Sequence, residues 1–396
     1  MILNFSDLHF GCKTHSQQLP SGYVTTEEVC IDICEQLLVE AAKPEIKMII
    51  FSGDLCHTNH PTTLVIDYLI SFFKRLDELG KPVIGIPGNH DASNYAHSFI
   101  FLRQLGLKHL FIYDDLNTPA LFNTDLYKTK IYLLPFVFGS NPVNKYNSVR
   151  EKFEEILNSI SPDEKAIVVS HFQESSCSTG SESSLVSKSV ESIDIDCIIP
   201  SGTYNVMCLL GHIHMHQYYK KLNGINVVYP GSPYPIDKAD CNQQKGFIIV
   251  DPDEMAFQFK PLKQLRNFIK YTIPSSTSIL DFFSKVRISK DSFIFVDKEI
   301  NSDTECENID IINQALQAKQ STCVSIKYIR KDIQKMIVST VEATSINAST
   351  LCTLFKQTVE QSDIPSTYDE QNFKTFLNGT YEFISKASDA YYKNQD

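Results

Sequence analysis

The sequence predicts an α/β protein in which apolar strands alternate with amphipathic helices over residues 1–255. Residues 48–51 are a short, wholly apolar run, typical of a strand buried in a parallel sheet. Residues 26–38 before it carry apolar side chains at helical spacing. Polar turns follow most of these strands, and the carboxyl ends of strands are where α/β proteins bind their ligands. The fold class and the place of the site are therefore predicted together.

The chain begins with a short strand over residues 2–6. Asp7 and His9 follow it, and they point to the same side of an extended chain because they are two residues apart. Residues 26–38 are the first predicted helix, and its apolar face marks the side that packs on the core. The apolar strand over residues 48–51 completes a β–α–β unit.

The second predicted helix spans residues 64–79 and ends at Gly80. An apolar strand over residues 82–87 leads directly into Gly88-Asn89-His90-Asp91, and a further, aromatic helix begins at Phe99. Polar groups that are buried without partners cost about 2–7 kcal/mol each. This polar run at the end of a buried strand therefore indicates a functional site.

The remaining part of the first 255 residues adds five strands and a helix. The strands span residues 130–135, 166–170, 205–210, 227–229 and 246–250, and the helix spans 149–160. His171 follows the second of these strands, and Gly211-His212-Ile213-His214 follows the third.

Beyond residue 256 the chain changes character. Residues 257–273 interleave basic and aromatic side chains, a pattern that suits a nucleic-acid backbone and equally an ordinary solvated strand face. Two strands and a helix between about 293 and 329 predict a small α+β domain, and two amphipathic helices follow after residue 349. We therefore expect three domains, over residues 1–255, 256–335 and 336–396.

The composition is that of a soluble globular protein, with 42% hydrophobic and 21% charged residues. No apolar run approaches the roughly 20 residues that span a bilayer, and the N-terminus lacks the pattern of a secretory signal. Eleven scattered cysteines without a Cys-x-x-Cys pair favour a reducing, cytoplasmic location. The net charge of −11 argues against nonspecific binding of polyanions, which uses a basic surface.

Five predicted strand ends carry side chains that can bind metals. They are Asp7 with His9, Asp54 with His57, Asn89 with His90, His171, and His212 with His214. A single pair is well explained as a helix cap beside a surface histidine, but five in succession are not. Aspartate, imidazole and amide donors together suit manganese, iron or zinc better than calcium. These candidate ligands are more than one ion needs, so they predict two ions about 3.5–4 Å apart, and such a pair hydrolyses phosphate esters.

In this order, the motifs resemble those of the calcineurin-like metallophosphoesterases. The motifs are Asp-x-His, Gly-Asp-x-x-His, Gly-Asn-His-Asp, a strand-end His and Gly-His-x-His. A narrower similarity, to the SbcD-type DNA repair exonucleases, is carried by residues 6–11, 53–57, 211–214 and 230–233. These exonucleases are the nuclease subunits of complexes with SbcC-type (SMC-like) ATPases, and such complexes are also found in large phages. The resemblance covers about residues 1–255 and implies a two-sheet sandwich flanked by helices, followed by a small α+β capping domain and C-terminal helices.

The resemblance also implies a role for each site residue. Asp7, His9 and His214 would hold the first metal, Asn89, His171 and His212 the second, and Asp54 would bridge them. His90 would lie beside the scissile phosphate, where it would stabilise the transition state or protonate the leaving oxygen. His57 would be a further catalytic group on the substrate side, and Asp91 would orient His90 or its loop.

By this resemblance the protein would be a Mn²⁺-dependent DNA nuclease in DNA repair, recombination and replication, with Mg²⁺, Fe²⁺ or Zn²⁺ as alternative ions. It would act as a 3′–5′ exonuclease on duplex ends and as an endonuclease on single strands or hairpins.

The capping domain would bind DNA, the C-terminal helices would dock the SMC-like ATPase, and helices around residues 64–79 and 98–106 would form a homodimer. We expect no membrane partner and a location in the cytoplasm, that of the host if a phage encodes the protein, in association with the nucleoid. The alternative is a phosphoprotein or small-phosphoester phosphatase of the same superfamily.

Overall fold

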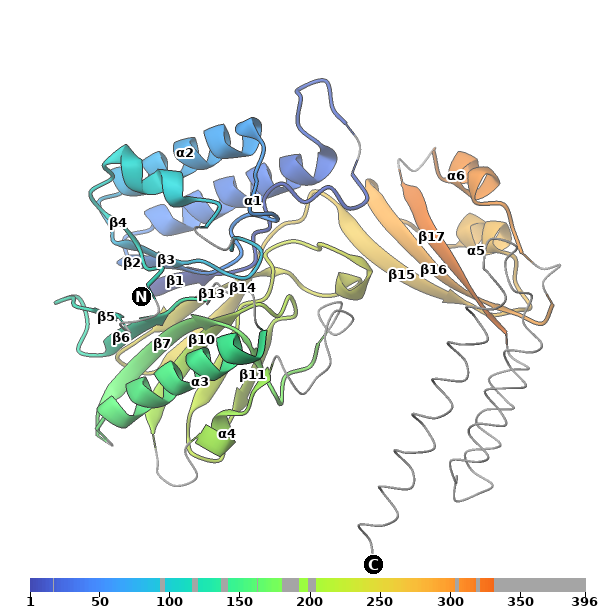
Figure 1. Ribbon diagram of the computed structural model, residues 1–396. Coiled ribbons are helices and arrows are strands. Elements are labelled where there is room, and N and C mark those ends of the chain that lie inside the picture. The colour runs from blue at the N-terminus through green and yellow to red at the C-terminus, as the bar shows by residue number, and fades with distance from the viewer. Residues whose placement is uncertain are drawn as a thin grey trace, which may run out of the picture. The chain divides into compact units, whose positions relative to one another are not determined.

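In the described part of the chain, two six-stranded sheets pack face to face, and helices cover their outer faces (Figure 1). Ile2, Ile50 and Ile84 of one sheet meet Ile167 and Leu209 of the other in the core between them. This confirms the predicted α/β class and the predicted two-sheet sandwich. The computed structural model describes residues 1–16, 18–92, 97–115, 120–136, 142–161, 163–179, 192–198, 204–302, 306–317 and 321–330.

The first sheet has the strand order β14-β13-β1-β2-β3-β4. These strands are β1 Ile2–Phe5, β2 Met48–Ser52, β3 Val83–Ile86, β4 Leu110–Ile112, β13 Gly246–Asp251 and β14 Ala256–Pro261. Strands β1 to β4 are parallel, and β13 is antiparallel to both of its neighbours. Helices α1 (Thr25–Ala42) and α2 (Thr63–Glu78) cover its outer face with apolar side chains such as Ile33 and Leu69.

The second sheet has the order β11-β12-β10-β7-β6-β5. These strands are β5 Ala120–Phe122, β6 Lys130–Leu134, β7 Lys165–His171, β10 Asn205–Gly211, β11 Gln217–Lys220 and β12 Asn226–Tyr229. The central strands β6, β7, β10 and β12 are parallel. Helix α3 (Pro142–Ser159) packs on the outer face through Val149, Phe153 and Leu157.

Short elements connect these layers. They are the 3₁₀ helix η1 Ile100–Leu105, strands β8 Gln173–Glu174 and β9 Ser192–Ile193, helix α4 Ile195–Ile198 and the 3₁₀ helix η3 Lys238–Asp240. The helix predicted to begin at Phe99 is therefore a short 3₁₀ helix, which ends where Gly106 takes up a left-handed conformation. None of the helices within the described ranges has the length and apolar character that a membrane crossing requires.

The region after residue 262 contains a three-stranded sheet and two helices. They are β15 Asn267–Ile273, α5 Ile279–Lys285, β16 Ser292–Ile300, α6 Ile309–Gln317 and β17 Thr322–Arg330. The sequence predicted β16, α6 and β17, left residues 257–273 as either a strand face or a nucleic-acid surface, and did not predict α5. Because β14 pairs with β13, the first sheet runs past residue 255, and we propose that the first domain extends to Pro261. The predicted domain over residues 336–396 lies outside the described residues.

Gly85 makes room for an aromatic ring inside the first sheet. It pairs with Phe51 across β2 and β3, and a Cβ atom at Gly85 would overlap the Phe51 ring. That ring also contacts Phe73 and Phe99, each with ring centroids 5.6 Å away. Any side chain at residue 85 would therefore push into a closely packed aromatic cluster.

We predict that Gly85→Ala lowers the free energy of unfolding by about 1–3 kcal/mol, because overpacking forces neighbouring side chains out of their preferred rotamers. Adding Phe51→Leu should cost less than the sum of the two single substitutions, since the second makes room for the first. Gly80→Asn is the control, because a Cβ at Gly80 meets nothing within 4 Å and Asn tolerates its φ of 67°. Urea unfolding followed by circular dichroism gives the comparison. Equal stability of Gly85→Ala and the wild type would contradict this account of the core.

Candidate metal centre

The predicted site residues follow three neighbouring parallel strands of the first sheet, β1 to β3, and two neighbouring parallel strands of the second, β7 and β10. The carboxyl ends of these strands meet at one edge of the sandwich. The loops after β1 and β2 are held together because the amides of Asp7 and His9 donate to the carbonyls of Gly53 and Asp54, at 3.1 and 2.9 Å. The backbone amide of His212 donates to Asp7 Oδ1 at 3.0 Å, which ties the second sheet to the first.

Asp7, His9 and His214 lie together, with one donor atom of each inside a group no wider than 4.8 Å. The Nε2 atoms of His9 and His214 are 3.1 Å apart. Asp7 and His9 are fully buried. These are the three residues that the resemblance assigned to the first metal, and the structure brings them together.

Asp54 lies between the two predicted metal positions. Its Oδ2 atom is 3.5 Å from His9 Nε2 and 3.3 Å from His171 Nε2. Asp7, Asp54 and His171 form a second group of close donor atoms. A carboxylate that faces ligands of both groups has the position that a bridging ligand requires.

The amide oxygen of Asn89 joins the remaining two histidines. Asn89 Oδ1 is 3.0 Å from His171 Nε2 and 2.8 Å from His212 Nδ1. The three residues assigned by resemblance to the second metal therefore also converge, although they come from strands of different sheets.

The spacing of these donor atoms fits metal coordination. Ligands about 2.1 Å from one ion, arranged as a tetrahedron or an octahedron, lie roughly 3.0–3.4 Å apart. The distances of 2.8–3.5 Å among the donors match that spacing. Aspartate oxygens, imidazole nitrogens and one amide oxygen suit Mn²⁺, Fe²⁺, Zn²⁺ or Mg²⁺. The seven residues therefore fit two divalent ions.

The electrostatics of the centre are dominated by Asp54 and His171. Burial opposes the charge on Asp54, but His171, His9 and His90 outweigh it and hold the pKa of that carboxyl well below its usual range. Burial also opposes charge on His171, yet the facing carboxylates of Asp54 and Asp7 raise its pKa to about 9. Without a cation these groups form an ion pair, and a metal would have to displace the proton of His171.

Two further histidines near this pair, His9 and His212, have pKa values below the ordinary range of histidine. Burial lowers the pKa of His9 well below its ordinary value, and burial together with the nearby His171 lowers the pKa of His212 to about 3. Neutral imidazole is the form that binds metals, so these rings need lose no proton to serve as ligands.

Backbone strain is concentrated at the predicted ligands. Asp7, His9, Asp54 and His212 all have left-handed backbone conformations, with φ of 53°, 44°, 49° and 94°. Such conformations cost about 1–3 kcal/mol each in residues other than glycine, and they persist only where the surroundings enforce them. Here the hydrogen bonds between the strand-end loops supply that enforcement. No sequence pattern revealed this feature.

A buried ion pair behind His214 was also missed by the sequence analysis. Lys245 Nζ donates to the carbonyl of His214 at 2.7 Å, to Ser232 Oγ at 2.9 Å and to Asp240 Oδ1 at 2.5 Å. Asp240 Oδ2 lies 3.8 Å from His214 Nδ1. These contacts fix the loop that carries His214. The resemblance had drawn attention only to residues 230–233 here, because Asp240 and Lys245 belong to no motif.

Asp91, to which the resemblance gave the role of orienting His90 or its loop, contacts the backbone of that loop. Its carboxylate accepts hydrogen bonds from the amides of Gly88, Leu55 and Cys56 at 3.0, 3.1 and 2.8 Å. Burial and the nearby Asp54 raise its pKa to about 7. No residue with a side chain fits in place of Gly88, because its Cβ atom would overlap the carboxylate and the backbone amide of Asp54.

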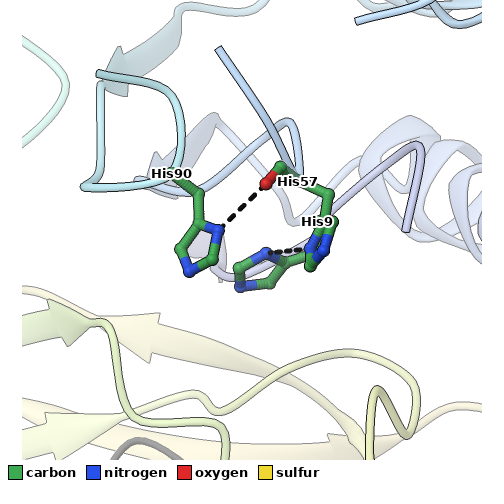
Figure 2. A group of neighbouring side chains, drawn as sticks. All are labelled: His9, His57 and His90. Carbon is green, nitrogen blue, oxygen red and sulfur yellow. Dashed lines mark hydrogen bonds between the residues drawn. The ribbon is translucent and has the colours of Figure 1, made fainter. Parts of the chain in front are cut away.

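His57 and His90 lie beside His9, one of the predicted metal ligands (Figure 2). The backbone amide of His90 donates to Asp54 Oδ1 at 2.8 Å, and its ring Nδ1 lies 2.9 Å from the carbonyl of His57. The ring Nδ1 of His57 lies 3.3 Å from His9 Nδ1. Both residues are partly exposed, whereas His9 is buried. The structure therefore places the two predicted catalytic histidines at the open side of the ligand cluster.

The chain is similar in sequence to several archaeal proteins, over stretches of different length. Over 90 residues the chain is 38% identical to the DNA double-strand break repair protein Mre11 of Saccharolobus solfataricus, a match that covers 23% of this chain and 22% of that protein. It is 23% identical to the Mre11 of Nanoarchaeum equitans over 354 residues, which cover 86% and 88% of the two chains. It is 21% identical to the Mre11 of Methanopyrus kandleri over 328 residues, which cover 78% and 68%.

The family of the chain follows from a comparison with protein families. Residues 1–216 match the calcineurin-like phosphoesterase family, and this stretch contains all seven of the converging donor residues. The matched stretch is more than half of the 396 residues. The chain therefore belongs to the calcineurin-like phosphoesterase family.

Proposed function

We propose that this chain is a metal-dependent DNA nuclease. The observation that carries the proposal is the convergence of seven side chains from five strand ends. Donor atoms of six of them lie 2.8–3.5 Å apart, and that of Asp7 lies within 4.8 Å of its neighbours. A centre of this composition suits the hydrolysis of phosphate esters. The chain's similarity to Mre11 proteins, which are named for DNA double-strand break repair, favours DNA as the substrate.

We assign Asp7, His9 and His214 to one ion, Asn89, His171 and His212 to the other, and Asp54 to both. Bound there, two divalent ions would clamp a phosphate and supply a hydroxide at neutral pH, with Mn²⁺ the ion we propose. The chain contributes the positions of these ligands, which its strained loops fix before any ion binds.

His90 is the proton donor of the proposal. Its Nδ1–H donates to a backbone carbonyl, so the proposed donor is the imidazolium form, whose Nε2–H faces a phosphate oxygen or passes its proton to a leaving oxygen. The hydrogen bond from its amide to Asp54 Oδ1 keeps the ring next to the metal centre. A histidine held in this way can protonate a leaving group without taking part in metal binding.

The extent of the match to one Mre11 protein supports a nuclease rather than a phosphatase. The match to the Nanoarchaeum equitans protein covers 86% of this chain, so it must extend well past residue 216, where the family match ends. It therefore includes sequence outside the phosphoesterase core that a phosphatase of the same superfamily does not need. A basic groove that binds DNA by charge alone is not favoured, because Lys238 and Lys270 both form ion pairs with Asp297. We therefore expect DNA affinity to depend on the metal centre and on a partner.

The partners we propose are a second copy of the chain and an SMC-like ATPase of the SbcC type. Leu64 at the start of α2 and Ile100 in η1 leave 40% and 43% of their surfaces exposed, which supports a homodimer through residues 64–79 and 98–106. The ATPase would bind the C-terminal helices, which lie outside the described residues. Loss of ATPase co-purification on truncation near residue 335 would support that docking, and retention would rule it out.

In an assay with Mn²⁺, we predict that the protein degrades labelled duplex DNA from its 3′ ends and cuts hairpins and single strands. A generic phosphomonoester serves as the competing substrate. Gel electrophoresis of 5′- and 3′-labelled strands shows the direction of digestion. Turnover of the monoester with intact DNA would identify a phosphatase and exclude the nuclease.

We predict that His90→Ala slows DNA cleavage by about 10²–10⁴-fold, the usual contribution of a positioned general acid. Its affinity for Mn²⁺, measured by calorimetry, should remain that of the wild type, because His90 is not one of the proposed ligands. His60→Ala is the matched control, since His60 is exposed and lies only three residues after His57. Loss of Mn²⁺ binding in His90→Ala would mean that the ring is a ligand.

Replacing Leu64 and Ile100 together by glutamate should convert the proposed dimer into a monomer. Two buried charges without partners make an apolar interface unfavourable. Light scattering after size-exclusion chromatography gives the mass of the full chain. A wild-type mass equal to the monomer, or a dimer that survives both substitutions, would contradict this interface.

A further inference from the structure

His57 contacts both His9 and His90, each through a different atom (Figure 2). Its carbonyl oxygen faces the ring of His90, and its ring nitrogen Nδ1 faces the ring of His9. The three rings pack closely. Those of His57 and His90 stack with centroids 5.3 Å apart, and His9 meets the two edge-on at 5.4 and 4.6 Å.

The contact with His90 determines which nitrogen of that ring carries hydrogen. A carbonyl oxygen can only accept a hydrogen bond, so His90 Nδ1, 2.9 Å away, must be the donor. In Figure 2 the other ring nitrogen of His90, Nε2, points away from His57. The carbonyl of residue 57 therefore orients His90, whatever side chain residue 57 has.

The contact with His9 determines the hydrogen position on a proposed metal ligand. His9 Nε2 faces Asp54 Oδ2 and His214 Nε2, so it is the atom that would bind the ion. A neutral imidazole that binds a metal through Nε2 carries its hydrogen on Nδ1. His9 Nδ1 is 3.3 Å from His57 Nδ1, so the His57 ring is the acceptor of that hydrogen.

We propose that His57 is a positioning residue of the first metal site, which acts through His9 by accepting the hydrogen bond from its Nδ1. The proposal rests on the metal centre of the proposed function. It replaces the substrate-side role that the resemblance implied, because the ring nitrogen of His57 faces a ligand. Partners of this kind hold a ligand ring in the tautomer and orientation that bind the metal, and their loss typically weakens metal affinity 10–100-fold.

The experiment compares three variants of the full chain by their Mn²⁺ affinity without DNA, measured by calorimetry and by the paramagnetic resonance signal of free Mn²⁺. His57→Ala removes the acceptor but keeps the carbonyl that orients His90. His57→Asn keeps an acceptor, because its amide oxygen can take the place of the ring Nδ1. His60→Ala is the control for the loss of a histidine from the same loop.

We expect His57→Ala to bind Mn²⁺ about 10–100-fold more weakly. His57→Asn and His60→Ala should bind like the wild type. Saturating Mn²⁺ should restore most of the DNA cleavage of His57→Ala, because His90 remains in place. If the wild type cuts no DNA but His57→Ala still binds Mn²⁺ more weakly than the wild type, the positioning role is supported. Only the proposed nuclease function is then contradicted.

Two results would overturn the proposal. Wild-type Mn²⁺ affinity in His57→Ala, with slow cleavage that extra Mn²⁺ does not restore, would place His57 on the substrate side. An equal loss of affinity in His57→Ala and His57→Asn, with circular dichroism showing both folded, would mean that the acceptor has no part in holding His9.

Discussion

The carboxylate of Asp54 is the group on which the rest of the site depends. One of its oxygens accepts a hydrogen bond from the backbone amide of His90, and the other faces the rings of both His9 and His171. It is buried, and its backbone has a φ of 49°. A buried carboxylate is stable only beside compensating donors or cations, so this residue requires the surrounding histidines as much as they require it. The absence of a side chain at Gly88 leaves the space that this arrangement needs.

The two-sheet architecture explains how residues from both halves of the chain reach Asp54. Strands β1 to β3 deliver Asp7, Asp54 and Asn89, and β7 and β10 of the other sheet deliver His171 and His212. His171 Nδ1 donates to the carbonyl of Ser52 at 2.8 Å, so a ligand from one sheet is fixed by the backbone of the other. The apolar core between the sheets therefore determines the distance between the two sets of ligands. It also compensates for the buried polar groups and strained residues at the edge.

The sequence predicted those parts of the fold that short segments determine by themselves. Apolar strands such as 48–51 and helices such as 64–79 have strong local periodicity, and the ligand motifs lie within a few residues of the strand ends. It missed α5, it left residues 257–273, which include β15, as either a strand face or a nucleic-acid surface, and it predicted an ordinary helix where η1 is a 3₁₀ helix. The contact between Lys245 and His214 and the acceptor role of the His57 ring depend on tertiary packing. Local patterns carry no information about such contacts.

The central claim is that the five strand ends form one centre for two metal ions. Anomalous diffraction from crystals of the full chain with Mn²⁺, measured at the manganese absorption edge, tests it most directly. The account predicts two manganese peaks on either side of the Asp54 carboxylate. One should lie beside Asp7, His9 and His214, and the other beside Asn89, His171 and His212. A single peak, or manganese bound away from Asp54, would contradict it.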